Sequence, residues 1–185
     1  NDLEQTVCYF EQSIAYYRSI DDRFYLAYLL KEFGVFYFTL AQPDKSAPLI
    51  KQSLDLRRQS GDLIGLADSV GAMGWIAYNL GCYHDAEAHW QESNQLLRKL
   101  RAPHMLAVHQ YQLAWLALFN HGDLASVRSL AADIRTVALN LNERQSTFRM
   151  LILFGILAGL NEEYDAGHQF FQQIEALNSS YFPFT

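Results

Sequence analysis

Apolar residues recur along most of this chain at intervals of three and four, the spacing that places them on one face of an α-helix. Turn-forming residues interrupt the pattern at 42–44, 81–82, 121–123 and 161–162. Because these turns are short, consecutive helices must run antiparallel. The pattern is clear in one stretch of two helices, with apolar positions at Leu66, Val70, Met73, Ala77 and Leu80, then at Ala86, Trp90, Leu97 and Leu100.

Two prolines fall inside the predicted helices and test this pattern. We place Pro103 at a helix start and Pro48 within a first turn. The first N–H groups of a helix have no partner within the helix, so a missing donor costs little there. Neither proline is expected to break a helix.

The helix pairs repeat at an interval of 40 residues. Phe33-Gly34 then coincides with Met73-Gly74, and one extra residue before Gly122 brings Phe154-Gly155 onto the same positions. Repeats of this length build stacked solenoids in which each unit contacts its neighbours. The predicted organisation is a single array over 1–185, made of a half unit at 1–20 and full units at 21–60, 61–100, 101–141 and 142–181.

Small residues recur within the units. Gly34, Gly74, Ala114 and Gly155 occupy the position where the two helices of a unit are expected to cross, and Ala86 and Gly167 let the second helix approach. A bulky residue at Gly74 should therefore destabilise the fold.

These residues resemble the tetratricopeptide repeat pattern, in a variant six residues longer than the common 34-residue form. The resemblance implies an all-α, right-handed α-solenoid of antiparallel helix pairs, with about nine helices. The 40-residue unit, opened by Gly61-Asp62, resembles the sensor arms of large bacterial signal-transduction (STAND-type) ATPases and related transcription activators. The motif is carried by Leu30, Phe33-Gly34 and Tyr37; by Val70, Met73-Gly74, Ala77, Ala86 and Trp90; and by Leu151, Phe154-Gly155, Ala158, Gly167 and Phe171.

In such a solenoid the first helix of each pair lines a concave groove. Exposed aromatic residues there would anchor a peptide, a protein or a small ligand such as an oligosaccharide. Aromatic residues at helical spacing also commonly belong to a core, so both interpretations stay open. The candidate groove residues are Tyr28, Lys31, Phe38, Asp68, Trp75, Tyr78, Asn79, Tyr111, Gln112, Trp115 and Arg149.

Relatives that bind chaperone C-termini hold the terminal carboxylate with a clamp of Lys and Asn residues. Here Lys31 and Asn79 are isolated, and Val35 and Trp75 stand where the clamp requires Asn. The resemblance therefore does not favour a chaperone adaptor.

Charge narrows the range of partners. Lys and Arg number 14 against 20 Asp and Glu, a net charge of −6, and no basic stripe offsets it, which disfavours nucleic acid and anionic lipid.

The longest apolar run, Met150 to Leu160, is too short to cross a bilayer. The first residues do not resemble a signal peptide, which favours a cytoplasmic location. Cys8 and Cys82 are far apart and are expected to be buried free thiols.

No pattern of catalytic or cofactor-binding residues is present. His84 and His89, like His104 and His109, are five residues apart rather than the four that would place a metal-binding pair on one helix face. Phosphate-binding loops and nucleophile motifs are missing, and acidic pairs such as Asp21-Asp22 and Glu162-Glu163 fall at turns, where they suit helix starts. We expect no enzyme, no metal and no cofactor.

Two functional classes remain. The preferred one is the interaction or sensor arm of a larger regulator. We expect the chain to be cut from a longer one, because it begins in a half unit and its last helix stays apolar. The alternative is a scaffold that oligomerises through its open apolar ends, head to tail or as a twofold dimer. The apolar residues near the last end are Phe170, Phe171, Ile174, Leu177 and Tyr181-Phe182.

Overall fold

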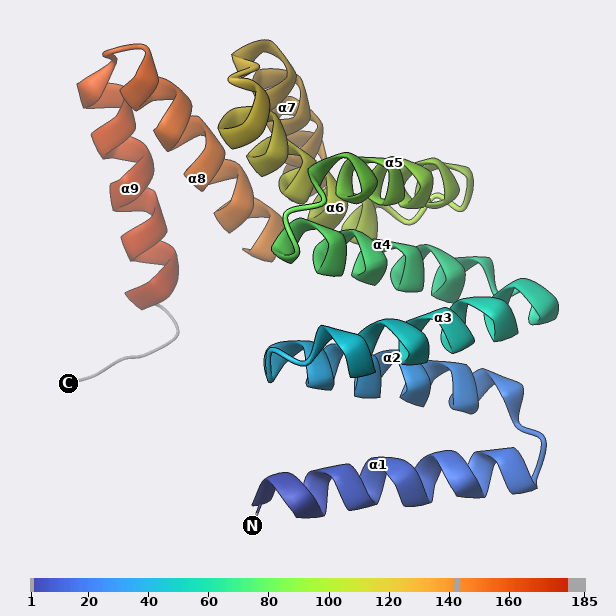
Figure 1. Ribbon diagram of the computed structural model, residues 1–185. Helices are drawn as coiled ribbons and strands as arrows, with labels where there is room; N and C mark the ends of the chain where they lie inside the picture. Colours follow the sequence, from blue (N-terminus) through green and yellow to red (C-terminus); the bar gives the residue numbers. More distant parts are fainter. Residues whose placement is uncertain (1, 142–143, 180–185) are drawn as a thin grey trace. The chain divides into compact units, whose positions relative to one another are not determined.

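The computed structural model describes residues 2–141 and 144–179, and these residues form helices without a strand (Figure 1). The predicted all-α solenoid of antiparallel helix pairs is confirmed. Tyr181-Phe182 and the rest of 180–185 lie outside the described residues. The helices are α1 (Asp2–Ser19), α2 (Arg23–Thr39), α3 (Pro43–Ser60), α4 (Leu63–Asn79), α5 (Tyr83–Lys99), α6 (Pro103–Leu116), the π-helical turn η1 (Ala117–His121), α7 (Leu124–Leu141), α8 (Arg144–Leu160) and α9 (Tyr164–Ser179).

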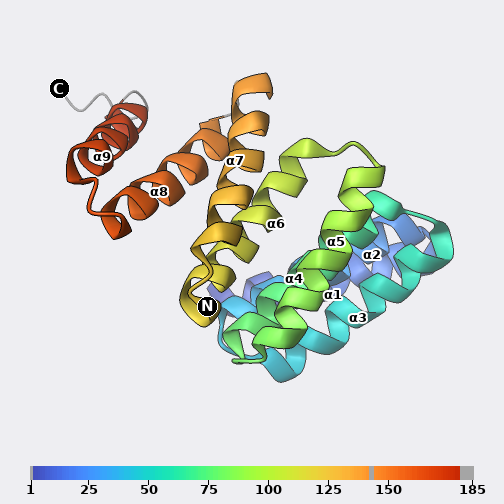
Figure 2. The same ribbon diagram turned by 90° about the horizontal axis from the view of Figure 1, so that it is seen from above.

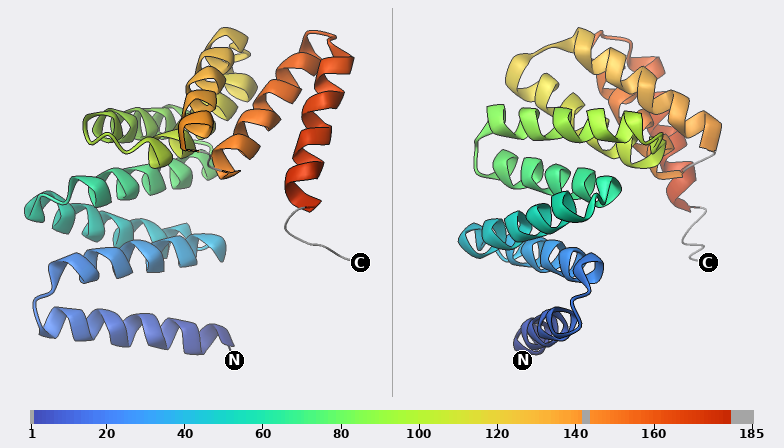
Figure 3. Two further views of the ribbon diagram at one scale, coloured as in Figure 1. Left: turned by 180° about the vertical axis from the view of Figure 1, so that it is seen from behind. Right: turned by 90° about the vertical axis from the view of Figure 1, so that its right-hand side faces the viewer.

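The helices form two compact units, which divide between Leu100 and Arg101. In the first unit, α1 to α5 follow one another as layers, each packed against the next (Figure 3). In the second, α6, α7, α8 and α9 pack in chain order, and α8 and α9 form an antiparallel hairpin (Figure 2). That the whole chain forms one continuous array stays a prediction.

The backbone repeats every 20 residues, half the length of the sequence unit. Helices begin at Arg23, Pro43, Leu63, Tyr83 and Pro103. The residue two positions before each start has a positive φ, a left-handed conformation that ends the preceding helix and turns the chain. These residues are Asp21, Ala41, Gly61, Gly81 and Arg101, followed after the extra residue by Gly122 and Glu162.

The extra residue predicted before Gly122 lies in the π-helical turn η1. The Asp123 N–H donates to the Ala117 carbonyl at 3.0 Å, a span of six residues. At the equivalent turn of the first unit, the Cys82 N–H donates to the Ala77 carbonyl at 2.9 Å, a span of five. The helix therefore takes up the added residue in a widened last turn, as π-turns commonly do.

Contacts of the small residues confirm the predicted crossing points at Gly34, Gly74 and Gly155. A Cβ atom at Gly34 would lie 2.5 Å from Ile50 Cγ1, and one at Gly74 would lie 2.6 Å from Trp90 Nε1. At Gly155 it would lie 3.3 Å from the ring of Phe171. In all three pairs the partner is 16 residues later, so the same crossing recurs in each helix pair.

Each unit has a core of its own. In the first unit, one cluster centres on Ile14, Leu30 and Phe33 and another on Ile50 and Val70. In the second unit, one cluster of buried residues comprises Ala107, Ala114, Ala117, Val127, Ala131, Ile134, Val137, Leu153 and Leu157.

Two predictions of detail were wrong. Helix α3 begins at Pro43, so Pro48 lies in the helix interior and not in its first turn; Pro103, by contrast, does begin its helix. Pro43 starts α3 because proline already has the helical φ value. Cys8 and Cys82 are both exposed rather than buried. Cys82 occupies the turn before α5, and Cys8 is an exposed residue of α1.

Within the described ranges, no helix is both long enough and apolar enough to cross a bilayer.

Candidate binding surface

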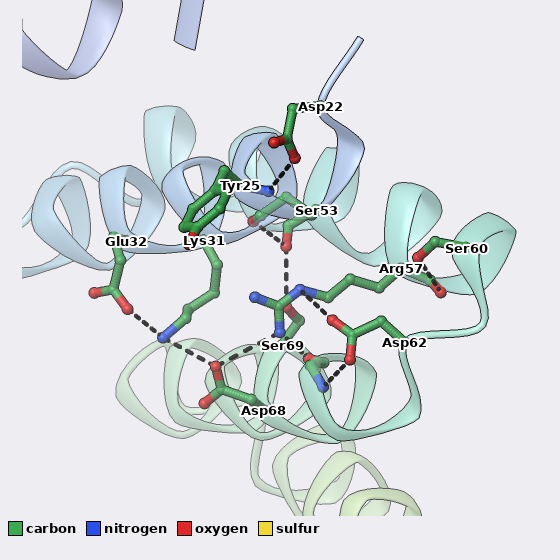
Figure 4. Close-up of polar contacts among 12 residues, drawn as sticks. Asp22, Tyr25, Lys31, Glu32, Ser53, Arg57, Ser60, Asp62, Asp68 and Ser69 are labelled. Atoms are coloured by element: carbon green, nitrogen blue, oxygen red, sulfur yellow. Dashed lines mark hydrogen bonds and ion pairs between the residues drawn. The ribbon is translucent and has the colours of Figure 1, made fainter. Parts of the chain in front are cut away.

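The first-unit candidates lie on α2 and α4, the first helices of two successive pairs, and these helices contact each other. An ion pair joins them, with Lys31 Nζ 3.0 Å from Asp68 Oδ2. Lys31 also donates to Glu32 at 2.6 Å, and its Nζ lies 5.8 Å from the centre of the Tyr28 ring. The structure therefore brings Tyr28, Lys31 and Asp68 together, and Figure 4 shows the Lys31–Asp68 pair.

The Lys31 side chain is only 12% exposed, so its charge needs compensation. Burial lowers the pKa of this ammonium, but the Asp68 and Glu32 carboxylates raise it by more, and the pKa of Lys31 lies above its ordinary value. Lys31 therefore stays charged and holds α2 to α4.

Sequence reasoning missed Arg57 of α3, which completes this cluster. Its side chain is 4% exposed and lies 3.7 Å from Asp68 Oδ2 and 4.0 Å from Asp62 Oδ2, while its Nη1 donates to the Gly65 carbonyl. A side chain at Gly65 would overlap the guanidinium, so this glycine leaves the space that Arg57 fills. The sequence did contain a signal that Arg57 is buried. The equivalent position one 40-residue repeat later is Leu97, an apolar residue that is buried.

Buried serine hydroxyls also escaped the sequence analysis. Ser53 donates to the Ala27 carbonyl at 2.7 Å, and Ser93 donates to the Ala67 carbonyl at 2.8 Å. Both bonds span 26 residues and are separated by one 40-residue repeat. They join the second helix of each pair to the first, and the recurrence of serine at this interval was the available signal.

The aromatic candidates of α4 form a partly exposed cluster. Trp75 is 43% exposed and stacks on Tyr78, with ring centroids 5.9 Å apart and planes 4° apart. Tyr78 in turn contacts Trp90 and Tyr83. Only Trp90 of this cluster is fully buried. Trp75 is therefore a surface residue supported by a packed aromatic layer.

The remaining first-unit candidates differ in their surroundings. Tyr28 is 47% exposed. Asn79 is exposed, and its amide donates to the Trp75 carbonyl at 2.8 Å near the end of α4. Phe38 is half-buried and packs against the cluster that contains Ile50. Their roles in binding stay predictions.

The second unit repeats the aromatic arrangement. Trp115 of α6 contacts Tyr111 edge to face at 5.8 Å, and stacks on Phe119 with centroids 5.0 Å and planes 5° apart. Phe119 lies in η1 and is 65% exposed. Sequence reasoning missed it, although counting the extra residue aligns Phe119 with Tyr78 of the first unit.

The last two candidates, Gln112 of α6 and Arg149 of α8, are half-buried. Among the described residues, neither Gln112 Oε1 nor Arg149 Nη1 has a hydrogen-bond partner, although both atoms are shielded from solvent. Buried polar atoms are nearly always paired, so these two need an explanation.

Three acidic residues at turns cap helices, and for Asp22 this role was predicted. Asp22 accepts from the Tyr25 N–H at 3.1 Å, and Asp62 accepts from the Gly65 N–H at 2.9 Å. Asp123 caps α7, and hydrogen bonds from Ser126 lower the pKa of its carboxyl. These side chains start helices.

Comparisons with known proteins bear on the fold. No protein-family model matches the sequence, and comparison with curated proteins gives no match. Among solved structures, BtubC (BKLC) from P. vanneervenii has a TM-score of 0.75 at 16% identity, covering 97% of this chain and 77% of that protein. Aspartyl phosphate phosphatase F from Bacillus subtilis has a TM-score of 0.81 at 15% identity, covering 95% of this chain.

The chain spans only 46% of the phosphatase, and at such identities the likeness concerns the fold alone. Together with the recurring crossings, these likenesses support a tetratricopeptide-like helical repeat fold.

Proposed function

We propose that this chain is a non-catalytic binding module that takes a protein or peptide partner on the face formed by α2 and α4 of the first unit, and that α6 and α8 form a face of the same kind on the second unit. The observation that carries the proposal is Trp75, which is 43% exposed although Trp90 already fills the core beside it. Large aromatic side chains such as Trp and Tyr are enriched among binding hot spots.

The composition of the face suits a protein partner. Tyr28 and Trp75 offer apolar area with few rotatable bonds, and the Lys31–Asp68 pair between their helices gives a fixed polar feature. An oligosaccharide could also stack on such rings and is the small-ligand alternative. The residues supply no chemistry beyond binding, since Lys31 and Asp68 already pair with each other.

We further propose that the module is the sensor or interaction arm of a larger cytoplasmic regulator of the STAND-type ATPase or transcription-activator kind. The 40-residue unit and its Gly61-Asp62 opening support this role. Sequencing the gene on both sides of this segment tests it, and a nucleotide-binding domain upstream is the expected result.

Selection from a displayed library of random peptides tests the binding role. The Kd of the selected peptides is then measured by fluorescence polarisation with Trp75→Ala. We expect at least a tenfold loss of affinity, because hot-spot truncations cost about 2 kcal/mol or more. Tyr9→Ala is the matched control, since Tyr9 is an exposed aromatic residue on α1, outside this face. Equal affinities for wild type and Trp75→Ala would refute the proposed face.

Self-assembly is the second candidate. Phe171 of α9 is 49% exposed and Ile174 is half-buried, so this helix offers apolar surface for another copy. Light scattering over a concentration series should then show a dimer that Ile174→Ser abolishes. A monomer at all concentrations would eliminate assembly.

A further inference from the structure

A groove runs along α1 on the side that faces α3. Two cavities, of about 300 and about 200 Å³, lie along it, and both are lined by Glu11. Their α1 residues recur at intervals of three and four from Leu3 to Arg18, so they form one stripe along the helix. At 1.5 Å per residue this stripe is about 22 Å long, which is the length of a four-turn helix.

The groove is mainly apolar. Helix α2 supplies its floor, and α1 and α3 supply its walls. On the α1 wall, Leu3 is 41% exposed and Val7 is half-buried, so a partner could still remove apolar area from water there. The apolar lining residues include Leu3, Val7, Leu30, Phe33, Tyr37 and Leu49.

Charged residues follow one another along the α1 wall at intervals of seven. They are Glu4, Glu11 and Arg18. Among the described residues, Glu11 has neither a hydrogen-bond nor an ion-pair partner, and Arg18 donates to the neutral amide of Gln52 at 3.3 Å. Seven residues are close to two helical turns, so the three charges lie on the same side of α1 in the order acidic, acidic, basic. A second helix with the opposite order of charges can match them.

We infer that this groove binds an α-helix of a separate protein, packed antiparallel to α1. From its N-terminus, this helix carries an acidic and then two basic residues at intervals of seven, between apolar residues that enter the groove. The acidic residue faces Arg18, and the basic residues face Glu11 and Glu4. The antiparallel direction is favoured because it places the acidic residue near the N-terminus of the bound helix and a basic one near its C-terminus, where each interacts favourably with the helix dipole.

A second copy of this chain matches the groove less well. In a twofold pair of α1 helices that brings Glu4 to Arg18, Glu11 would face Glu11 of the other copy, and like charges repel. The charge is also particular to α1, because a shift of 40 residues replaces Glu11 with Lys51 on α3. A helix that presents a cation to Glu11 would meet another cation at that equivalent position.

The probe is a helical peptide of about 18 residues, capped at both ends and held helical by a hydrocarbon staple on its outer face. It carries leucines on its inner face and Glu, Lys and Lys at intervals of seven. Fluorescence polarisation measures its Kd. We expect Glu11→Lys to weaken binding at least tenfold, because an attractive pair becomes a repulsive one. A second peptide, with the central Lys changed to Glu, should show the reverse preference and bind Glu11→Lys at least tenfold more tightly than wild type.

Glu92→Lys is the matched control. Glu92 is an exposed residue of α5, so the variant changes the net charge equally and leaves the groove intact. It should keep the wild-type affinity, as should Trp75→Ala, because Trp75 does not line the groove. Glu11→Lys should melt close to the wild-type temperature, since Glu11 is exposed and unpaired within the described residues.

A second variant tests the groove without changing charge. Ala15 is exposed and lines the smaller cavity, so Ala15→Gln places a longer polar side chain in the groove while sparing the core. It should weaken binding of the probe to the protein at least tenfold. Unchanged affinity would show that the peptide binds elsewhere and would overturn the inference.

The remaining outcomes also decide the inference. Equal losses in Glu11→Lys and Glu92→Lys would reduce the effect to net charge and overturn it, and so would the absence of binding at about 1 mM peptide. Neither result touches the face around Trp75, which the library peptides test separately. A dimer that forms at rising protein concentration and is abolished by Ala15→Gln would assign the groove to a second copy and overturn the choice of partner.

Discussion

The contact between Gly74 and Trp90 sets how closely α4 and α5 approach. Trp90 is 1% exposed, and its indole N–H donates to the Gly71 carbonyl at 3.1 Å, so the ring cannot move aside without breaking that bond. A methyl group at Gly74 would lie 2.6 Å from Nε1. Gly74→Ala should therefore lower the free energy of unfolding by about 1–3 kcal/mol through overpacking.

Urea denaturation measures this loss, and Gly159→Ala is its control. Gly159 is also in a helix, but a Cβ atom there would meet nothing within 4 Å. That variant should gain up to about 1 kcal/mol from the higher helix propensity of alanine. Equal effects of the two substitutions would mean that helix packing does not depend on the small residue.

Lys31 makes stability depend on pH in the alkaline range. Its pKa in the folded protein is above the ordinary value of 10.5, so the folded state holds this proton more tightly than the unfolded state does. The stabilisation is complete below pH 10.5 and is lost as the pH rises through the folded pKa. The tyrosines also titrate there, so wild type must be compared with a variant.

Lys31→Met is the suitable variant because it keeps the aliphatic stem and removes the charge. Urea midpoints measured between pH 8 and 11.5 should show wild type as the more stable protein at pH 8, with the difference shrinking above pH 10.5. In the variant, Asp68 still faces Arg57 at 3.7 Å, which limits the damage at pH 8. A difference that stays constant with pH would show that Lys31 does not titrate as inferred.

At the scale of elements, η1 shows how a helix accepts an added residue. The widened turn lies at the end of its helix, where Asn120 is exposed and contributes nothing to the core. Deleting Asn120 should restore the 20-residue spacing and change the melting temperature by only a few degrees. Both the helix before it and the helix after it keep their buried faces.

Deletion of Ala132 is the matched control, because this residue is equally exposed but lies within α7. One residue is 100° of helix rotation, so the deletion turns Ile134 and Val137 away from the core. Each displaced side chain costs about 2–5 kcal/mol, enough to unfold the second unit. Circular dichroism at rising temperature distinguishes the two deletions, and similar melting curves would contradict this account of η1.

The elements show which features a sequence can predict. Gly34, Gly74 and Gly155 predicted the helix crossings. A residue without a side chain that recurs at one repeat position indicates that two helices approach each other closely there. The Lys31–Asp68 pair could not be predicted, although both residues were candidates, because their meeting depends on the register between α2 and α4. Phe119 was missed because the shape of η1, and not the helical period, brings it onto Trp115.

At the scale of the whole molecule, each of the two units has a core of its own. Leu153 is fully buried in the cluster of the second unit, and Gly74 and Trp90 lie in the first. Repeat proteins owe their stability to contacts between neighbouring elements, so a defect weakens the stack that contains it. We therefore expect the units to unfold in separate transitions in urea rather than in one.

Tryptophan fluorescence can assign those transitions. Trp75 and Trp90 belong to the first unit and Trp115 to the second, so a Trp115→Phe background reports on the first unit alone. In that background Gly74→Ala should lower the urea midpoint, whereas Leu153→Ala, which costs about 2–5 kcal/mol, should leave it in place. Circular dichroism detects both units, so it should also show the transition of the second unit. Leu153→Ala should lower the urea midpoint of that transition, and Gly74→Ala should leave it in place. If Leu153→Ala moves the fluorescence midpoint as far as Gly74→Ala does, the chain unfolds as one cooperative array.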